Sequence, residues 1–107
     1  MKIDLKAEYG KQTISRDDGK IVANRLVDAM GKEEEIVIDF SNILIASVSF
    51  FDEAFGKLAF KYSKETLAKK LTFKNIEDFD KALLNDILVS RYHQKELEMK
   101  QKSKRKS

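Results

Sequence analysis

The amino-acid sequence predicts an α/β fold, a mixed sheet of about four strands with about three helices packed on it. Strand-like apolar segments are followed along the chain by segments with helical apolar spacing, in the order β-β-α-β-α-β-α. The 107 residues contain no proline, internal repeat or linker, which indicates a single domain. Strands that alternate with helices need crossover connections, so we expect parallel connections within the sheet.

The first part of the chain predicts two short strands. Ile3 and Leu5 alternate with charged residues, as in a half-buried strand over residues 2–7. Residues 9–11 contain a glycine and predict a turn, and residues 12–14 predict a short second strand.

Residues 15–31 predict the first helix. Ser15 is a favourable N-cap, and Asp17 and Asp18 suit the positive end of the helix dipole. Apolar residues then recur at helical spacing as far as Gly31, which is a natural C-terminal stop.

Residues 36–40 form the clearest strand of the chain. The segment is apolar on both faces until Asp39, which is typical of a central strand covered on each side. Residues 43–46 continue apolar and are expected to bring the chain to the edge of the sheet.

A second helix is predicted over residues 49–62. Ser49 and Asp52 have the spacing of a reciprocal capping pair at its start, and an apolar face follows at helical spacing. That spacing predicts that the phenylalanine cluster is core rather than a base-stacking surface, which needs interleaved basic residues. Phe50 and Phe60 lie off the main face, and we expect either of them to be exposed to a partner.

The remaining sequence predicts one more strand and one more helix. Residues 63–70 are a polar connection or a helix end, and residues 71–73 predict a short strand. Asn75 is expected to cap the last helix, with Asp78 at the third helical position. The apolar stripe of this helix fades from Tyr92 onward.

The basic character of the chain is concentrated at its C-terminal end. The net charge is +3, but five of the 21 basic residues and none of the 18 acidic residues lie within residues 100–107. The other 16 basic residues therefore leave residues 1–99 with a net charge of −2. We expect residues 1–99 to be a single domain and residues 100–107 to be a basic, disordered tail.

The residues offer no recognisable set of catalytic groups. Without cysteine there is no thiol nucleophile and no cysteine-ligated metal, and the single histidine, His93, lies in a polar segment that favours solvation over catalysis. Asp39 and Asp52 offer a metal-binding or acid–base pair, but the strand end and the helix cap are the preferred interpretation. No apolar run is long enough to span a bilayer and no signal peptide is seen, which predicts a cytoplasmic protein. We expect neither an enzyme nor a cofactor.

The most informative pattern lies in residues 39–56. A buried strand ends in Asp39-Phe40, a short loop with two serines follows, and a helix begins with the run Ser49-Phe50-Phe51-Asp52-Glu53-Ala54-Phe55-Gly56. Over roughly residues 10–92 this pattern resembles the STAS-like domain family, in particular its small stand-alone bacterial proteins. STAS domains are the fold of anti-sigma-factor antagonists.

The resemblance implies a regulatory protein–protein interaction module that binds its partner around residues 47–55. The implied partner is a histidine-kinase-like ATPase of the switch-kinase or anti-sigma type. In anti-sigma-factor antagonists the loop before this helix holds an acid, two hydroxyl residues and a glycine, and the second hydroxyl is phosphorylated. Those positions are Ser47, Val48, Ser49 and Phe50 here, which makes Ser49 the implied phosphoacceptor. The implied partner-binding residues are Ser47, Phe50, Asp52 and Glu53.

Two alternatives remain open at this point. Ser49 is either a phosphoacceptor or only the cap of its helix, and a capping serine can be both. The second alternative for the whole chain is a nucleic-acid-associated regulator that uses the basic tail of residues 100–107. The sheet edges and Phe60 permit a dimer, and the sequence leaves the oligomeric state open.

Overall fold

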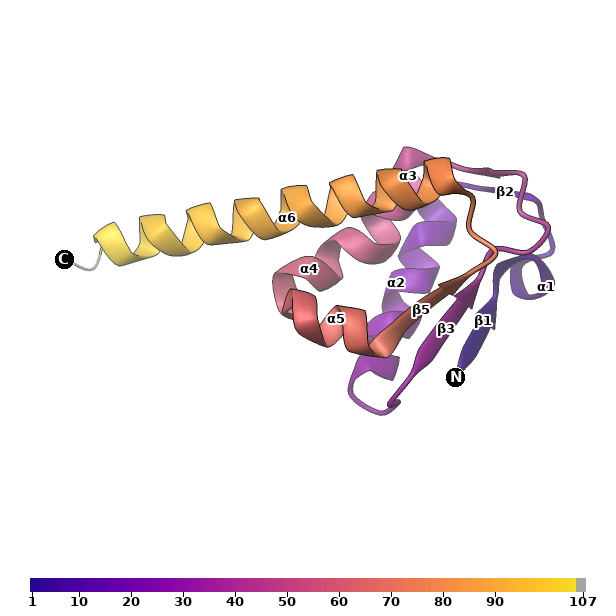
Figure 1. Cartoon of the computed structure of the whole chain (residues 1–107), viewed down its shortest axis with the longest axis horizontal. Coiled ribbons are helices and arrows are strands. Elements are labelled where there is room, and N and C mark those ends of the chain that lie inside the picture. Colours follow the sequence, from indigo (N-terminus) through magenta and orange to yellow (C-terminus); the bar gives the residue numbers. More distant parts are fainter. Residues whose placement is uncertain (106–107) are drawn as a thin grey trace.

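Two small parallel sheets organise the fold in the computed structural model, which describes the backbone of residues 1–105 and the side chains of residues 1–101 (Figure 1). The first sheet has the order β1-β3-β5 and consists of β1 (Lys2–Asp4), β3 (Ile36–Asp39) and β5 (Leu71–Lys74). The second sheet pairs β2 (Thr13–Ile14) with β4 (Ile45–Ala46). The predicted α/β class is confirmed.

The prediction of one mixed sheet is wrong in its details. The described residues form five strands in two sheets, and every strand pair is parallel. The reason lies in the connections: helical crossovers link the paired strands, so each strand re-enters the sheet in the same direction as its neighbour. The second sheet arises because residues 43–46, expected at the edge of the main sheet, pair instead with the short strand at residues 13–14.

Helices connect these strands and pack against them. They are α1 (Leu5–Tyr9), α2 (Arg16–Met30), α3 (Val48–Phe51), a π-helical turn (Asp52–Gly56), α4 (Lys57–Lys61), α5 (Lys64–Lys70) and α6 (Asp78–Arg105). Three of these segments, α3, the π-helical turn and α4, are continuous and together form the helix predicted over residues 49–62.

Local capping explains two elements that the sequence patterns missed. Residues 5–9 are helical rather than extended because Asp4 accepts a hydrogen bond from the backbone N–H of Ala7 at 3.0 Å, and Gly10 ends the turn with a φ of 68°. In the same way Ser63 caps α5, where its Oγ accepts a hydrogen bond from the backbone N–H of Thr66 at 3.2 Å. Residues 63–70, for which the sequence allows a polar connection or a helix end, therefore contain a helix.

The helices α2 to α6 lie on one side of the first sheet (Figure 1). The side chains of Ile3, Ile36 and Ile38 point to that side and are fully buried. On the opposite face Lys2, Thr72 and Lys74 are exposed. The strand β3 is therefore central as predicted, but a helical layer covers it on one face only.

A cluster of phenylalanine rings joins the sheet to the helices. Phe40 stacks on Phe51 with ring centroids 5.8 Å apart, and Phe55 meets Phe73 edge to face at 5.3 Å. Phe51 and Phe55 are fully buried, which confirms that this cluster is core. Gly19 permits the close packing of α2 against α3, because a Cβ atom at this position would lie 2.7 Å from the carbonyl oxygen of Phe50.

Helix α6 is much longer than predicted. It has 28 residues, or about 42 Å at 1.5 Å per residue, and its C-terminal half extends past α4 and α5 (Figure 1). Residues 100–105, expected to belong to a disordered tail, continue this helix. Lys106 and Ser107, the rest of the predicted tail, lie outside the described residues.

Candidate functional site

Two helix starts lie side by side at one end of the molecule. Strands β2 and β4 pair in parallel, and each leads through a single serine, Ser15 or Ser47, into a helix. The backbone N–H of Ser47 donates to the carbonyl of Ile14 at 3.1 Å, which fixes the two starts relative to each other. The N-terminal turns of α2 and α3 therefore open at the same edge of the molecule.

Hydrogen bonds and an ion pair stabilise the start of α2. The Asp18 carboxylate accepts from the backbone N–H of Ser15 at 3.0 Å, which completes a capping box. It also lies 2.9 Å from the Lys11 Nζ. Burial raises the pKa of Asp18, but the Lys11 and Ser15 contacts outweigh it and hold the pKa below its ordinary value. The predicted cap at Ser15 is confirmed.

The start of α3 is capped by Ser47 rather than by Ser49. The Oγ of Ser47 accepts a hydrogen bond from the backbone N–H of Phe50 at 3.0 Å, and Ser47 has the extended backbone of an N-cap. The prediction of a Ser49–Asp52 capping pair is wrong, because pairing of β4 with β2 ends the strand at Ala46 and sets the helix start two residues earlier.

Ser49 is therefore free of the capping role. It lies in the first turn of α3, half-buried, and its Oγ accepts a hydrogen bond from the Nη2 of Arg16 at 3.5 Å. Arg16 is itself exposed at the first position of α2. A hydroxyl group, a guanidinium group and the positive ends of two helix dipoles are thus close together at this edge.

Large apolar side chains lie exposed next to Ser49. Leu44, Ile45 and Val48 are 70%, 60% and 59% exposed, and all three fall within residues 44–48. We call these three residues the helix-start patch. Their exposure follows from the local structure, because the side chain of Ile45 points outward from β4 while that of Ala46 points into the core.

Phe50 does not belong to this surface. Its side chain is fully buried and meets Phe51 and Phe55 edge to face, at centroid distances of 5.5 Å and 6.1 Å. The expectation that Phe50 is exposed is wrong, because the earlier helix start rotates position 50 toward the core. Phe60, the other candidate, is half-buried, with the Arg91 guanidinium over its ring.

Asp52 and Glu53 lie in the π-helical turn that follows α3. The Asp52 Oδ1 accepts two hydrogen bonds from Arg91 of α6, at 3.1 Å from Nε and 2.5 Å from Nη2. Glu53 pairs with Lys57 at 3.6 Å. The ion pair with Arg91 ties the helix that carries Ser49 to α6.

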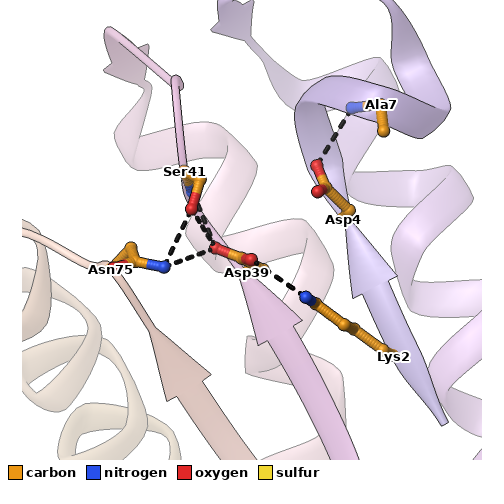
Figure 2. A network of polar contacts seen from close by, with 6 residues as sticks. All are labelled: Lys2, Asp4, Ala7, Asp39, Ser41 and Asn75. Atoms are coloured by element: carbon orange, nitrogen blue, oxygen red, sulfur yellow. Dashed lines mark hydrogen bonds and ion pairs between the residues drawn. The ribbon is translucent and has the colours of Figure 1, made fainter.

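Asp39 lies at the carboxyl end of the central strand, where three strand ends meet (Figure 2). Its Oδ1 accepts from Asn75 Nδ2 at 2.9 Å, from the Ser41 backbone N–H at 2.9 Å and from Ser41 Oγ at 2.6 Å, while Oδ2 lies 3.4 Å from Lys2 Nζ. These contacts, first among them the one from Asn75, lower the pKa of Asp39 well below its ordinary range.

The Asp39 network is structural, since its donors satisfy the carboxylate and link the end of β3 to Lys2 of β1 and to Asn75, which follows β5. Asn75, predicted as the cap of the last helix, belongs to this network and has a left-handed φ of 56°, so that prediction is wrong. Asp39 and Asp52 bond to separate partners, which gives no support to a joint metal-binding or acid–base role.

Other chemical features are few in the described part of the chain. Within residues 1–105 no three histidine, cysteine, aspartate or glutamate side chains gather in a way that suits a metal ion. His93 is exposed, as predicted. In the same residues no helix has both the length and the apolar content needed to cross a membrane.

Sequence reasoning missed three features of this region: the Arg16–Ser49 contact, the Asp52–Arg91 pair and the exposure of the helix-start patch. The first two join residues 33 and 39 positions apart, so no local pattern reveals them. For the third a signal was present, because the apolar run over residues 43–46 is too continuous for a strand with one exposed face.

Comparison with known proteins gives one match. A family model described as a STAS-like domain of unknown function matches residues 18–81. This range contains the helix-start patch, Ser49, the π-helical turn and Asp39, and it ends in the first turn of α6. No curated protein and no solved structure matches the chain.

Proposed function

The chain belongs to the STAS-like domain family, and from this membership and the site we propose that it is a regulatory module that binds a protein partner through the helix-start patch. Domains of this family are generally non-catalytic. The observation that carries the proposal is the exposure of Leu44, Ile45 and Val48 beside Ser49 and Arg16.

The helix-start patch has the character of a protein-binding surface. Three large aliphatic side chains, each more than half exposed, are grouped in one short segment, whereas exposed apolar residues on soluble proteins are usually scattered. The polar residues beside them, Arg16, Ser47 and Ser49, are suited to the polar rim of an interface. Burial of the patch against a partner stabilises a complex by removing this apolar area from water.

Ser49 is the proposed switch of this surface. Transfer of the γ-phosphoryl group of ATP to Ser49 Oγ releases ADP and places about −1.5 to −2 charges in the first turn of α3. The contact of Arg16 with the Ser49 Oγ supports this role, because a guanidinium group pairs well with a phosphate. The added charge lies next to the helix-start patch and near Asp52 and Glu53, so it opposes the burial of the patch and repels an acidic partner.

The proposed partner is a histidine-kinase-like ATPase of the switch-kinase or anti-sigma type, which the family resemblance implies. Such a partner would supply the ATP needed for the switch. Interaction and switch are separable, because the patch is able to bind a partner whether or not Ser49 is ever modified.

A matched pair of substitutions tests the interaction. Val48→Asp places a charge in the helix-start patch, and Val27→Asp makes the same change on α2, at another exposed valine. Affinity capture from the native cells should recover the same ATPase with the wild type and with Val27→Asp, but not with Val48→Asp. Equal recovery with Val48→Asp contradicts the proposal. Recovery of nucleic acid alone, with loss on removal of residues 100–107, favours the nucleic-acid alternative.

A second set of variants tests the switch on the captured partner. Ser49→Asp should weaken binding, Ser49→Ala should preserve it, and Ser90→Asp, an exposed site on α6, should leave it unchanged. The intact mass of the recovered wild-type chain should show a phosphate-sized increment that Ser49→Ala lacks. Equal binding by Ser49→Asp and Ser49→Ala would exclude the switch but not the interaction.

A further inference from the structure

The C-terminal part of α6 has no protein surface to pack against. We call residues 93–105 the arm. Within its described side chains, through Gln101, all are exposed except Lys95, which is half-buried. The exposed residues include Leu97 at 47% and Met99 at 61%. Figure 1 shows the arm extending past α5 without another element beside it.

A helical arm of this length needs support. An isolated helix of about 13 residues is marginal in water, because nucleation is costly and few hydrogen bonds repay it. The first half of α6 obtains its support from the core, against which Leu84, Leu88 and Tyr92 pack. The arm presents apolar side chains with no such cover in a single chain.

An open cavity lies where the arm leaves the body. We call it the notch. It has a volume of about 550 Å³ and lies between the start of α5 and α6. Val89, Tyr92 and Met99 line it together with charged residues of both signs, Lys64, Glu65, Lys95 and Glu96. It adjoins a mostly apolar cavity of about 270 Å³, which shares Val89 and Tyr92 with it. Together they form a groove along the side of α6.

We propose that the arm of a second copy of this chain occupies the notch, so that two α6 helices pair in antiparallel fashion about a two-fold axis. Such an interface is self-complementary: the arm of each copy covers the notch of the other. Met99 fits the role of the inserted side chain, since methionine is long, flexible and adapts to irregular apolar surfaces.

The distribution of charge favours a second copy as the occupant. Residues 100–107 contain five basic residues, whereas residues 1–99 carry a net charge of −2. Antiparallel pairing brings the basic end of each chain over the body of the other, which carries the opposite net charge. It also sets the two helix dipoles antiparallel, which is the favourable orientation.

Sedimentation velocity of the full-length chain over a wide range of concentration tests the pairing. We expect the wild type to form a reversible dimer. Met99→Asp and Val89→Asp should each weaken it by about a hundredfold, because each change removes two apolar side chains from the dimer interface and adds two charges. Val48→Asp, the matched valine control in the helix-start patch, should dimerise like the wild type.

Circular dichroism provides a second, independent measurement. If pairing supports the arm, helix content should rise with protein concentration in the wild type and stay at the low value in Met99→Asp. Met99 lies beyond the packed body, so at concentrations where the wild type is monomeric the thermal unfolding of this variant should match that of the wild type.

Three outcomes would overturn the proposal. A wild type that stays monomeric with constant helix content at all concentrations shows that the arm has no second copy as partner. A dimer that withstands both α6 substitutions but not Val48→Asp uses the helix-start patch instead. Helix content that rises only when duplex DNA is added, and falls back with salt, assigns the arm to nucleic acid. The first and third outcomes do not bear on the partner proposed for the helix-start patch, whereas the second would give that patch a second copy of the chain as its occupant.

Discussion

The starts of α2 and α3 are built alike but differ in what they leave exposed. Both follow a short parallel strand, both have a serine N-cap, and they lie side by side. At the α2 start the third helical residue is Asp18, which is buried and closes the turn on Ser15 and Lys11. At the α3 start the third helical residue is Phe50, which turns into the core and leaves Val48 and Ser49 at the surface.

This difference separates a structural role from the proposed partner-binding role within a single motif. At the α2 start the Asp18 carboxylate is used in contacts that stabilise the fold, and the exposed positions carry charged side chains. The α3 start is anchored by one cap and one aromatic ring, so its remaining first-turn residues are available to a partner. Substitutions at the first start should therefore lower the free energy of unfolding, and substitutions at the second should mainly change binding.

The largest effect is expected at the contact between the two starts. Gly19→Ala places a Cβ atom 2.7 Å from the Phe50 carbonyl oxygen, and backbone must move to relieve the clash. We expect the free energy of unfolding to fall by about 3 kcal/mol, measured by urea denaturation. The control is Gly31→Ala, where the nearest atom is 3.9 Å away and the change should be close to neutral. Equal effects at both glycines would show that the two helices are not held in close packing.

Asp18 gives the next largest effect, with a defined dependence on pH. Asp18→Ala removes the capping box and the Lys11 pair, which should cost about 2 kcal/mol at neutral pH. The pKa of Asp18 is lower in the folded chain than in the unfolded one, so its contribution is present above pH about 4 and is lost as the pH falls further. The difference in stability between wild type and variant should therefore shrink in acid.

The adjacent exposed acid is the control for this experiment. Asp17→Ala removes the same charge from the same helical turn without a buried partner, and it should change stability by only a few tenths of a kcal/mol. If Asp17→Ala and Asp18→Ala were equally destabilising, the closure of the α2 start would be a general charge effect rather than a specific buried contact.

The same comparison shows which parts of the site the sequence was able to predict. Ser15 and Asp18 form a capping pair at local spacing, so the α2 start was predicted correctly. Ser49 and Asp52 have the same spacing, but the pairing of β4 with β2 makes Ser47 the cap. The prediction that Asn75 caps the last helix failed for a related reason, because its side-chain amide bonds to Asp39, which is distant in the sequence. Local spacing fails where a strand partner or a distant side chain decides the position.

The same contrast between local patterns and long-range contacts applies to the fold as a whole. Apolar periodicity predicted the central strand and the two helices that the structure has at residues 16–30 and 48–61, the second with a start set too late, because burial sets those patterns. It did not predict two separate sheets, since a strand of two residues carries too little pattern to name its partner. The length of α6 was missed for the opposite reason: the arm is helical without an apolar face that its own chain buries.

A smaller effect is expected at the cap of α3. Ser47→Ala removes the hydrogen bond to the Phe50 backbone N–H and should lower stability by about 1 kcal/mol. Ser47→Asp keeps a side-chain acceptor at the N-cap and should retain wild-type stability. Thermal unfolding of the two variants checks this pair. A loss in Ser47→Asp as large as that in Ser47→Ala would show that Ser47 contributes by packing rather than by capping.

The smallest effect on stability, and the most informative about the switch, is expected at Ser49. Because Ser49 is not the cap, Ser49→Ala should change the free energy of unfolding by less than about 0.5 kcal/mol. Ser49→Asp should be neutral or slightly stabilising, since the new carboxylate lies beside Arg16 and in the first turn of a helix. A double-mutant cycle of Ser49→Asp with Arg16→Gln measures the contribution of Arg16.

The coupling in this cycle should be about 0.5 kcal/mol, and it should diminish as salt is added, because Arg16 is exposed to solvent. A favourable coupling means that Arg16 stabilises a negative charge at position 49, as the proposed switch requires. Its absence at low salt would leave the phosphate without the guanidinium partner on which the switch depends. The open helix start would then bind its partner without being regulated there, and the two starts would differ in exposure alone.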